Sequence, residues 1–291
     1  MHNYPTSILY YSLKSSDTTL ISLSVPFNLE DKNHITPSCL SSPHVRTHLS
    51  TVFTESTPEG VASLRWALEQ GRPVDIDIQA PISDAVWESF EDIIQKATDG
   101  LETVPSIILC QFISIQSLPV TDFILPWYSA NVLPPPHDLE LPIVKLMNHP
   151  TYLAFQVQAA ALSLFPYVSV KFLPPSWDAP TPPTPSVEVA EISDSKQKRE
   201  WKRRIKMYCK FCSFKISSAI QSPCAIVGPV IEAFGYQRII FGSSPCPTSQ
   251  GSSIARDWYE IARESLVELG VEQEMVDAVF YGNAKRVYGS K

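Results

Sequence analysis

The sequence predicts an α/β fold built from parallel β/α units. Short apolar strands alternate with helix-length amphipathic segments along most of the chain. The 26 prolines cluster where such a chain would place its loops, at 134–136 and 174–185. At 291 residues and 44% hydrophobic content, the chain is large enough to bury a substantial core.

The first element with clear start and stop signals is a helix that starts at residue 57. Residues 1–56 show no sustained periodicity, apart from a candidate strand at 19–27, so we treat them as a poorly defined N-terminal segment. Thr57 is a favourable N-cap and Pro58 suits the first helical position, while Gly71 is typical of a helix end. We assign 57–291 to one β/α domain.

Strands and helices then alternate to the end of the chain. Alternating apolar residues predict a strand at 73–79, and a helix follows at 83–97 with one apolar face. Further strands are expected at 106–110, 167–172 and 238–241, and further helices at 141–164, at 196–208 and in two segments ending at Tyr288. These make five strands, whereas a closed barrel of parallel strands needs eight.

Charge and hydropathy exclude several classes of function. The formal net charge of -7 predicts no general attraction to nucleic acid or to an anionic membrane. A basic run at 196–206 contains Trp201. It could be read as a nucleic-acid contact, but we favour the solvated face of a helix whose Trp201, Ile205 and Tyr208 point toward the protein interior.

The location that we expect is the cytoplasm. The first residues lack a cationic segment followed by a signal-peptide core, and no stretch has the uncharged length needed to span a bilayer. Six cysteines at irregular spacing, without a secretion signal, favour reduced thiols.

Three segments in the C-terminal part resemble a known family. Residues 234–245 contain Gly235, Arg238, an apolar strand and then Gly-Ser-Ser-Pro, and residues 283–288 read Asn-Ala-Lys-Arg-Val-Tyr. Residues 165–171, Phe-Pro-Tyr-Val-Ser-Val-Lys, form a third match. Together they resemble the amidohydrolase-related family that includes lactonases and decarboxylases. The resemblance implies a TIM-barrel metal-dependent hydrolase fold, incomplete or degenerate at its N-terminus.

The resemblance also implies where a site would lie. Barrel enzymes carry their chemistry at the carboxyl ends of the strands, so the loop after Phe241 is expected to face it. Ser244 stands where the family has an acidic residue, and His149 is a candidate for its mid-barrel histidine, so these two are the catalytic candidates. Ser243, Lys171 and His137 are the candidates for substrate binding. Ser243 and Ser244 could equally be loop-capping residues.

No metal ligands are assigned. A divalent metal such as zinc is implied by the resemblance, yet the family's His-x-His motif is absent from the sequence. His44 and His48 could share a helix face, but no acidic residue accompanies them. Cys209 and Cys212, with Cys224 beyond them, lack the second pair that a structural zinc site usually requires.

Two segments interrupt elements that would otherwise be continuous, at 111–130 and 209–227. The codons at the ends of both segments can contain splice signals, which leads to the hypothesis that they are retained introns translated in frame. On that hypothesis both are non-native insertions.

Three hypotheses about function follow. The first is an active enzyme that, as the resemblance implies, hydrolyses a C–N or C–O bond of a small molecule with a divalent metal, or decarboxylates it. The second is a catalytically inactive homologue, a pseudoenzyme that binds a small molecule without a metal site. The third is a mis-spliced product that does not fold stably. A homo-oligomer is compatible with each folded alternative, and the glycine fingerprints of serine hydrolases, phosphate loops and dinucleotide folds are absent.

Overall fold

Six parallel strands form one sheet in the order of the chain. The computed structural model describes residues 22–31, 46–78, 84–111, 150–174, 198–199, 201–202, 205, 229–243 and 254–289. The strands are β1 (Leu23–Pro26), β2 (Thr47–Phe53), β3 (Val74–Ile78), β4 (Ile107–Gln111), β5 (Val168–Phe172) and β6 (Ile239–Phe241). Each strand pairs with the next one in parallel.

This sequential parallel order is the order of strands in a TIM barrel, and the predicted α/β class is confirmed. The described sheet has β1 and β6 at its two edges. The sequence did not predict β2, which lies within the segment 1–56 that showed no periodicity. Within the described residues, the strand expected at 19–27 covers only Leu23–Pro26.

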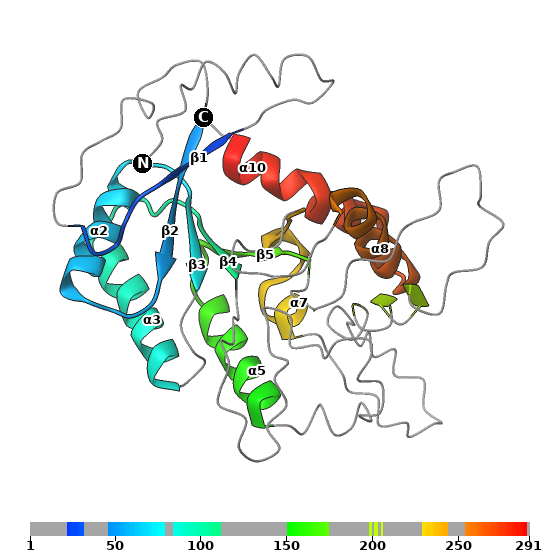
Figure 1. Cartoon of the computed structure of the whole chain (residues 1–291), viewed down its shortest axis with the longest axis horizontal. Coiled ribbons are helices and arrows are strands. Elements are labelled where there is room, and N and C mark those ends of the chain that lie inside the picture. The colour runs from blue at the N-terminus through cyan, green and yellow to red at the C-terminus, as the bar shows by residue number, and fades with distance from the viewer. Residues whose placement is uncertain are drawn as a thin grey trace.

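The connecting helices pack on one face of the sheet, as Figure 1 shows. They are α2 (Pro58–Glu69), α3 (Asp84–Thr98), α5 (Pro150–Ser163) and α7 (Pro229–Phe234). The predicted start of α2 is confirmed, because the Thr57 hydroxyl oxygen accepts a 3.0 Å hydrogen bond from the Gly60 amide. Gly71 follows this helix with a φ of 67°, a left-handed conformation that suits glycine.

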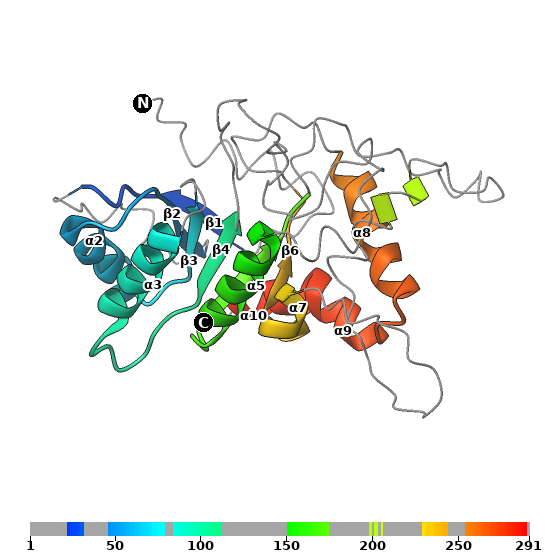
Figure 2. The ribbon, with the colours of Figure 1, turned by 90° about the horizontal axis from the view of Figure 1, so that it is seen from below.

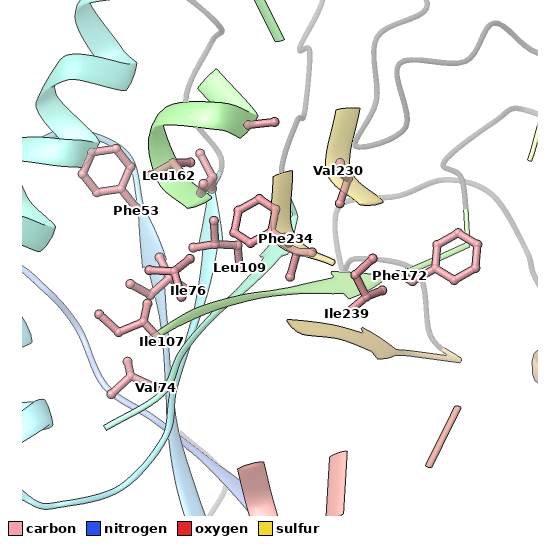
Figure 3. Close-up of a cluster of buried hydrophobic side chains, with 14 of the residues drawn as sticks. Phe53, Val74, Ile76, Ile107, Leu109, Leu162, Phe172, Val230, Phe234 and Ile239 are labelled. Carbon is pink, nitrogen blue, oxygen red and sulfur yellow. The ribbon is translucent and has the colours of Figure 1, made fainter. Parts of the chain in front are cut away.

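The hydrophobic core lies between that face and the helices. Figure 3 shows Ile76 and Leu109 of the strands near Leu162 of α5 and Phe234 of α7. All four side chains are buried. Because successive side chains of a strand point to opposite faces, the intervening residues of β2 to β5 face the other, concave side of the sheet.

The remaining C-terminal elements are α8 (Ala255–Glu268), α9 (Gln273–Asp277), a π-helical turn (Ala278–Gly282) and α10 (Asn283–Gly289). The first three pack into the core on the helix-covered face, and Figure 2 shows α8 and α9 at the other end of the sheet from α2 and α3. In Figure 1, α10 lies on the opposite side of the strands from α2 and α3, where it covers part of the concave side. Val287 of α10 packs against Ile108 of β4 and Ile240 of β6 in a small cluster of its own.

The basic run at 196–206 differs in part from the prediction. Trp201 and Ile205 are buried as expected. Lys198 and Lys202 are not solvated: their side chains are 5% and 6% exposed, and both ammonium groups bind Glu264 of α8, at 2.9 and 3.2 Å. Lys202 also binds Glu268 at 2.7 Å. An anionic helix therefore neutralises these two lysines, which removes them as a nucleic-acid contact.

None of the helices within the described ranges combines the length and the apolar character that crossing a bilayer requires. The segments proposed as insertions lie outside the described residues, except that Gln111 is the last residue of β4.

Candidate functional site

Polar side chains from four adjacent strands meet on the concave face. They are His48 of β2, Asp75 of β3, Cys110 of β4 and Lys171 of β5. In the parallel register Ser50, Asp75, Ile108 and Ser169 lie at one level of the sheet, and His48, Cys110 and Lys171 are each two residues from that level, on the same face. Alternation along each strand then directs these side chains away from the helix-covered core.

Asp75 is the centre of this group. Its Oδ2 lies 2.5 Å from the Lys171 ammonium and 3.4 Å from Nε2 of His48. Its Oδ1 accepts a 2.7 Å hydrogen bond from the hydroxyl of Tyr288, at the end of α10. The Tyr288 ring also packs on the His48 ring, with centroids 4.6 Å apart. Three donors from three different elements thus hold one buried carboxylate.

The electrostatics of Asp75 and Lys171 stabilise both charges. Burial alone would raise the pKa of Asp75, but the hydrogen bond from His48 and the positive charge of Lys171 outweigh it, so that the pKa lies below its usual value. Burial alone would lower the pKa of Lys171, and the neighbouring acidic groups of Cys110 and Asp75 more than reverse this. The pair is therefore an ammonium–carboxylate pair over the whole neutral range.

The other two titratable neighbours are neutral. Burial, with the charge of Asp75 in addition, raises the pKa of the Cys110 thiol far above its ordinary value. The same two causes raise the pKa of the Tyr288 hydroxyl. A thiol that stays protonated is a poor nucleophile, so Cys110 is a packing residue beside the ion pair.

A pocket of about 690 Å³ opens above these groups. Such a volume is in the range of small-molecule sites. Its described lining combines polar and apolar side chains, namely Ser24, Pro26, Phe27, Asn28, His48, Ser50, Thr51, Val52, Asp75, Asp77, Cys110, Lys171 and Leu173. A second, apolar gap between β5, β6 and α7 holds only about 10 Å³, too little for a ligand larger than water.

The donor set of the pocket does not fit the divalent metal that the sequence motifs imply. Among the described residues, no three His, Cys, Asp or Glu side chains converge as a metal site would need. The oxygens of Asp75 already face an ammonium, an imidazole and a phenol. On β1, the two residues that line the pocket are Ser24 and Pro26, not histidines. The cation that balances Asp75 is Lys171.

The residues predicted from the sequence are distributed unevenly. Lys171 lies at the base of the pocket. Ser243 is exposed in the loop after β6 and is not part of the described pocket lining. Ser244, His149 and His137 lie outside the described residues. The suggestion that His44 and His48 share a helix was wrong, because His48 is on strand β2, where it faces β1 and β3 instead.

The sequence analysis missed Asp75, Asp77 and Tyr288. A signal for the first two was present: two carboxylates alternate with apolar residues in a strand that both neighbours bury. In such a strand, an acidic residue needs a partner, and so marks a polar site. Tyr288 had no comparable signal, because its contact with β3 depends on how the last helix crosses the sheet.

The motifs that carried the family resemblance join the end of the chain to β6. The Asn283 amide donates 2.7 Å hydrogen bonds to the carbonyl oxygens of Tyr236 and Ile239. Arg286 donates to the carbonyl oxygen of Gln237 and, at 3.2 Å, to Oδ1 of Asn283. The two segments are therefore parts of one structural joint, and neither contributes a side chain to the described pocket except through Tyr288 and its bond to Asp75.

Arg238, the other polar residue of these motifs, also has a structural role. Its guanidinium donates to the carbonyl oxygens of Ser163, the last residue of α5, and of Phe165 just beyond it. It also donates to those of Ala233 and Phe234 in α7. A cation at two helix C-termini interacts favourably with both helix dipoles. Burial lowers the pKa of Arg238, but a guanidinium remains charged.

Comparisons with known proteins concern the fold alone. No protein-family model and no curated sequence matches the chain. A solved structure from Pseudomonas putida, provisionally assigned as a 2-pyrone-4,6-dicarboxylic acid hydrolase, is similar over 98% of this chain and 77% of its own, at 13% identity and a TM-score of 0.46. Amidohydrolase 2 from Bifidobacterium longum subsp. infantis is similar over 84% of this chain and 62% of its own, at 13% identity and a TM-score of 0.38.

The protein's own geometry defines its class. It is an α/β protein with six described parallel strands in TIM-barrel order, and a polar pocket lies on the concave face of its sheet. At 13% identity, the similarity to these two solved structures supports no statement about its reaction.

Proposed function

We propose that this chain is an amidohydrolase-type α/β protein whose concave pocket binds a small polar molecule, and that metal-assisted hydrolysis is not retained. The main observation behind this proposal is that Lys171, His48 and Tyr288 surround the carboxylate of Asp75. A carboxylate with three donors and a depressed pKa is a stable counter-ion. It is a poor general base, because such a base works best with a pKa near the operating pH.

The charges of the pocket indicate the class of ligand. Lys171 and Asp75 neutralise each other, and the described lining also contains the carboxyl group of Asp77. Hydroxyl and amide groups of Ser24, Ser50 and Asn28 supply further donors and acceptors. A neutral molecule that carries a carbonyl and several hydroxyl or amino groups matches this lining.

A ligand screen tests this proposal. Neutral hydroxylated lactones and amides, small amines and dicarboxylates would be added to the purified protein, and its melting temperature measured. Neutral compounds are expected to stabilise it, by about 2.7 kcal/mol at a concentration of 100 Kd. Zn²⁺ and a chelator are expected to leave the melting temperature unchanged. A stoichiometric, chelator-sensitive metal in the purified protein would overturn the metal-free part of the proposal.

A pocket-filling variant ties any binding to this pocket. Val52 lines the pocket and is 43% exposed, so Val52→Trp is expected to block it without touching the ion pairs. Val267→Trp on α8, where valine is 52% exposed, is the matched control and should bind as the wild type does. Equal binding by the Val52 variant would place the ligand elsewhere and refute the assignment of this pocket.

A second candidate function is hydrolysis without a metal. The observation that favours it is Asp77, a second carboxylate on the pocket-facing side of β3 and nearer than Asp75 to its carboxyl end. Asp77 would act as the base that deprotonates water. Proton release from a panel of lactones, compared between the wild type and Asp77→Asn, tests this: turnover that Asp77→Asn abolishes supports hydrolysis, and the lack of turnover supports binding alone.

A further inference from the structure

Ser22, His48 and Asp75 form a continuous polar line at the amino end of the sheet. The Ser22 hydroxyl lies 2.9 Å from Nδ1 of His48, and Nε2 of the same ring lies 3.4 Å from Oδ2 of Asp75. Ser22 immediately precedes β1, His48 is on β2 and Asp75 is on β3. The parallel pairing places Ser24 beside His48, so that Ser22 lies two residues further toward the amino end.

The carboxylate selects the tautomer of His48. An ionised Asp75 can only accept, so the ring nitrogen that faces it, Nε2, carries the proton. In a neutral imidazole, Nδ1 then keeps its lone pair, and this lone pair faces the Ser22 hydroxyl. The alternative acceptor for that hydroxyl, the carbonyl oxygen of Arg46, is further away at 3.3 Å. The arrangement is a hydroxyl, a base and an orienting carboxylate in line.

The base is held in place by its surroundings. The Tyr288 ring packs on the imidazole at 4.6 Å. Lys171 and Tyr288 fix the two oxygens of Asp75 from the other side. The His48 ring therefore has one orientation in which both of its nitrogens are engaged, which is what an activated serine requires of its base.

We propose that Ser22 is a nucleophile toward activated esters, with His48 as its general base and Asp75 as the positioning residue. This activity goes beyond the binding function proposed above. The Ser22 Oγ bonds to the ester carbonyl carbon, and the bond from that carbon to the leaving oxygen breaks. His48 Nδ1 takes the hydroxyl proton and passes it to the leaving alkoxide. Water then attacks the acyl-serine with the same base, releasing a carboxylic acid and restoring the hydroxyl.

Motif searches miss this arrangement because it contains no Gly-x-Ser-x-Gly turn. A nucleophile, base and carboxylate are recognised by geometry and role, and they recur on unrelated folds in any chain order. Here the order along the chain is Ser, His, Asp. Ser22 lies before the first residue of its strand, whereas the pocket opens toward the carboxyl ends of the strands. His48 and Asp75 belong both to the line that starts at Ser22 and to the pocket lining.

Labelling with a fluorophosphonate probe and turnover of p-nitrophenyl acetate test the proposal. The wild type is expected to carry one label, which peptide mass spectrometry places on Ser22, and to release p-nitrophenol. Ser22→Ala is expected to lose both. Ser163→Ala, which removes a hydroxyl at the end of α5 that bonds only within its own helix and does not line the described pocket, is the control and should keep both. His48→Gln is expected to lower the rate by at least about a hundredfold.

Each other outcome contradicts the proposal. An unlabelled wild type, a label on another residue, or equal rates for Ser22→Ala and the wild type would refute a nucleophilic Ser22. Should His48→Gln melt at a much lower temperature, the comparison between Ser22→Ala and Ser163→Ala still tests whether Ser22 is the nucleophile. Because Ser22 does not line the pocket, Ser22→Ala should bind pocket ligands normally. A failure of labelling is thereby distinguished from a failure of the pocket to bind.

Discussion

The hydroxyl of Tyr288 donates a 2.7 Å hydrogen bond to Oδ1 of Asp75, a residue 213 positions earlier in the chain. This bond ties the last helix to the third strand across the concave face. The Tyr288 ring also lies 5.6 Å from the Lys171 ammonium, within the range of a cation–π contact. The C-terminal helix is thus part of the polar site as well as of the fold.

Tyr288→Phe tests how much this hydrogen bond contributes to the free energy of unfolding. The ring and its contacts with His48 are kept, while a buried carboxylate loses one of its donors. We expect a loss of about 1.5–3 kcal/mol in the free energy of unfolding, the usual range for hydrogen bonds to charged groups. Urea denaturation measures it. Tyr281→Phe, at a position 57% exposed, should change stability little, and an equal loss in both variants would contradict the prediction.

Asp75→Asn should be the more damaging change. It leaves the Lys171 ammonium buried without its counter-ion, which typically costs about 3–5 kcal/mol. In the double variant Asp75→Asn/Lys171→Met, neither charge remains, so we expect part of the stability to return. Chemical denaturation of both variants and the wild type gives the comparison. Glu69→Gln, which removes an exposed partner of Arg65, is the control and should cost under about 1 kcal/mol.

The same pKa shifts fix how stability depends on pH. The pKa of Asp75 is lowered on folding, so its contribution is present above its unfolded value, near 3.8, and is lost as the pH falls through the folded value. The pKa values of Tyr288 and Lys171 are raised, so their contributions are present below about 10.0 and 10.5 and are lost at higher pH.

The pKa of the Cys110 thiol is also raised, from an unfolded value near 9.0, so we expect a stability plateau between about pH 4 and pH 9, with a decline on either side. Urea titrations across that range measure it. Tyr288→Phe should make the alkaline decline shallower, because the tyrosine no longer ionises preferentially in the unfolded chain. An alkaline limb identical to that of the wild type would show that Tyr288 does not contribute to it.

Asn283→Ala should weaken the joint between α10 and β6. The side chain is buried, and its amide satisfies two backbone carbonyl groups. Losing both bonds is expected to lower the free energy of unfolding by about 2 kcal/mol. Gln273→Ala, which removes an exposed bond to Asp277, should stay within about 0.5 kcal/mol of the wild type. Thermal melts of the two variants measure the difference. Equal melting temperatures would contradict the predicted contribution of Asn283.

Arg238→Lys keeps the charge but removes the planar fork that reaches four carbonyl groups. A lysine ammonium is too compact to serve the ends of α5 and α7 at once. We expect the free energy of unfolding to fall by about 2 kcal/mol, which chemical denaturation measures. The exposed Arg256→Lys is the matched control and should be close to neutral. A neutral result at both positions would show that the interactions with the helix ends are dispensable.

The fold was predictable where local signals were strong. Thr57, Pro58 and Gly71 carry their own capping chemistry, and the structure places α2 between them. Strand β2 was missed because its sequence, Thr47 to Phe53, is not a continuous apolar run. Its core-facing residues Leu49 and Phe53 are separated by residues that are mostly polar or small. Its identity as a strand depends on pairing with β1 and β3.

The site was less predictable than the fold. Lys171 was found through a family resemblance, and nothing local indicated that its partner would be Asp75. That pairing depends on strands separated by 96 positions in sequence. Lys198 and Lys202 illustrate the same limit, since an isolated basic helix is correctly expected to be solvated. Only the presence of Glu264 and Glu268 on the neighbouring helix makes their burial favourable.

The joint made by Asn283, Arg286 and the backbone of residues 236–239 bears on what the motifs of this sequence can indicate. These residues attach the end of the chain to the sheet, and they do not line the described pocket. A motif match at these positions therefore speaks for architecture. A comparison aimed at binding or catalysis would start instead from Asp75, His48 and Lys171.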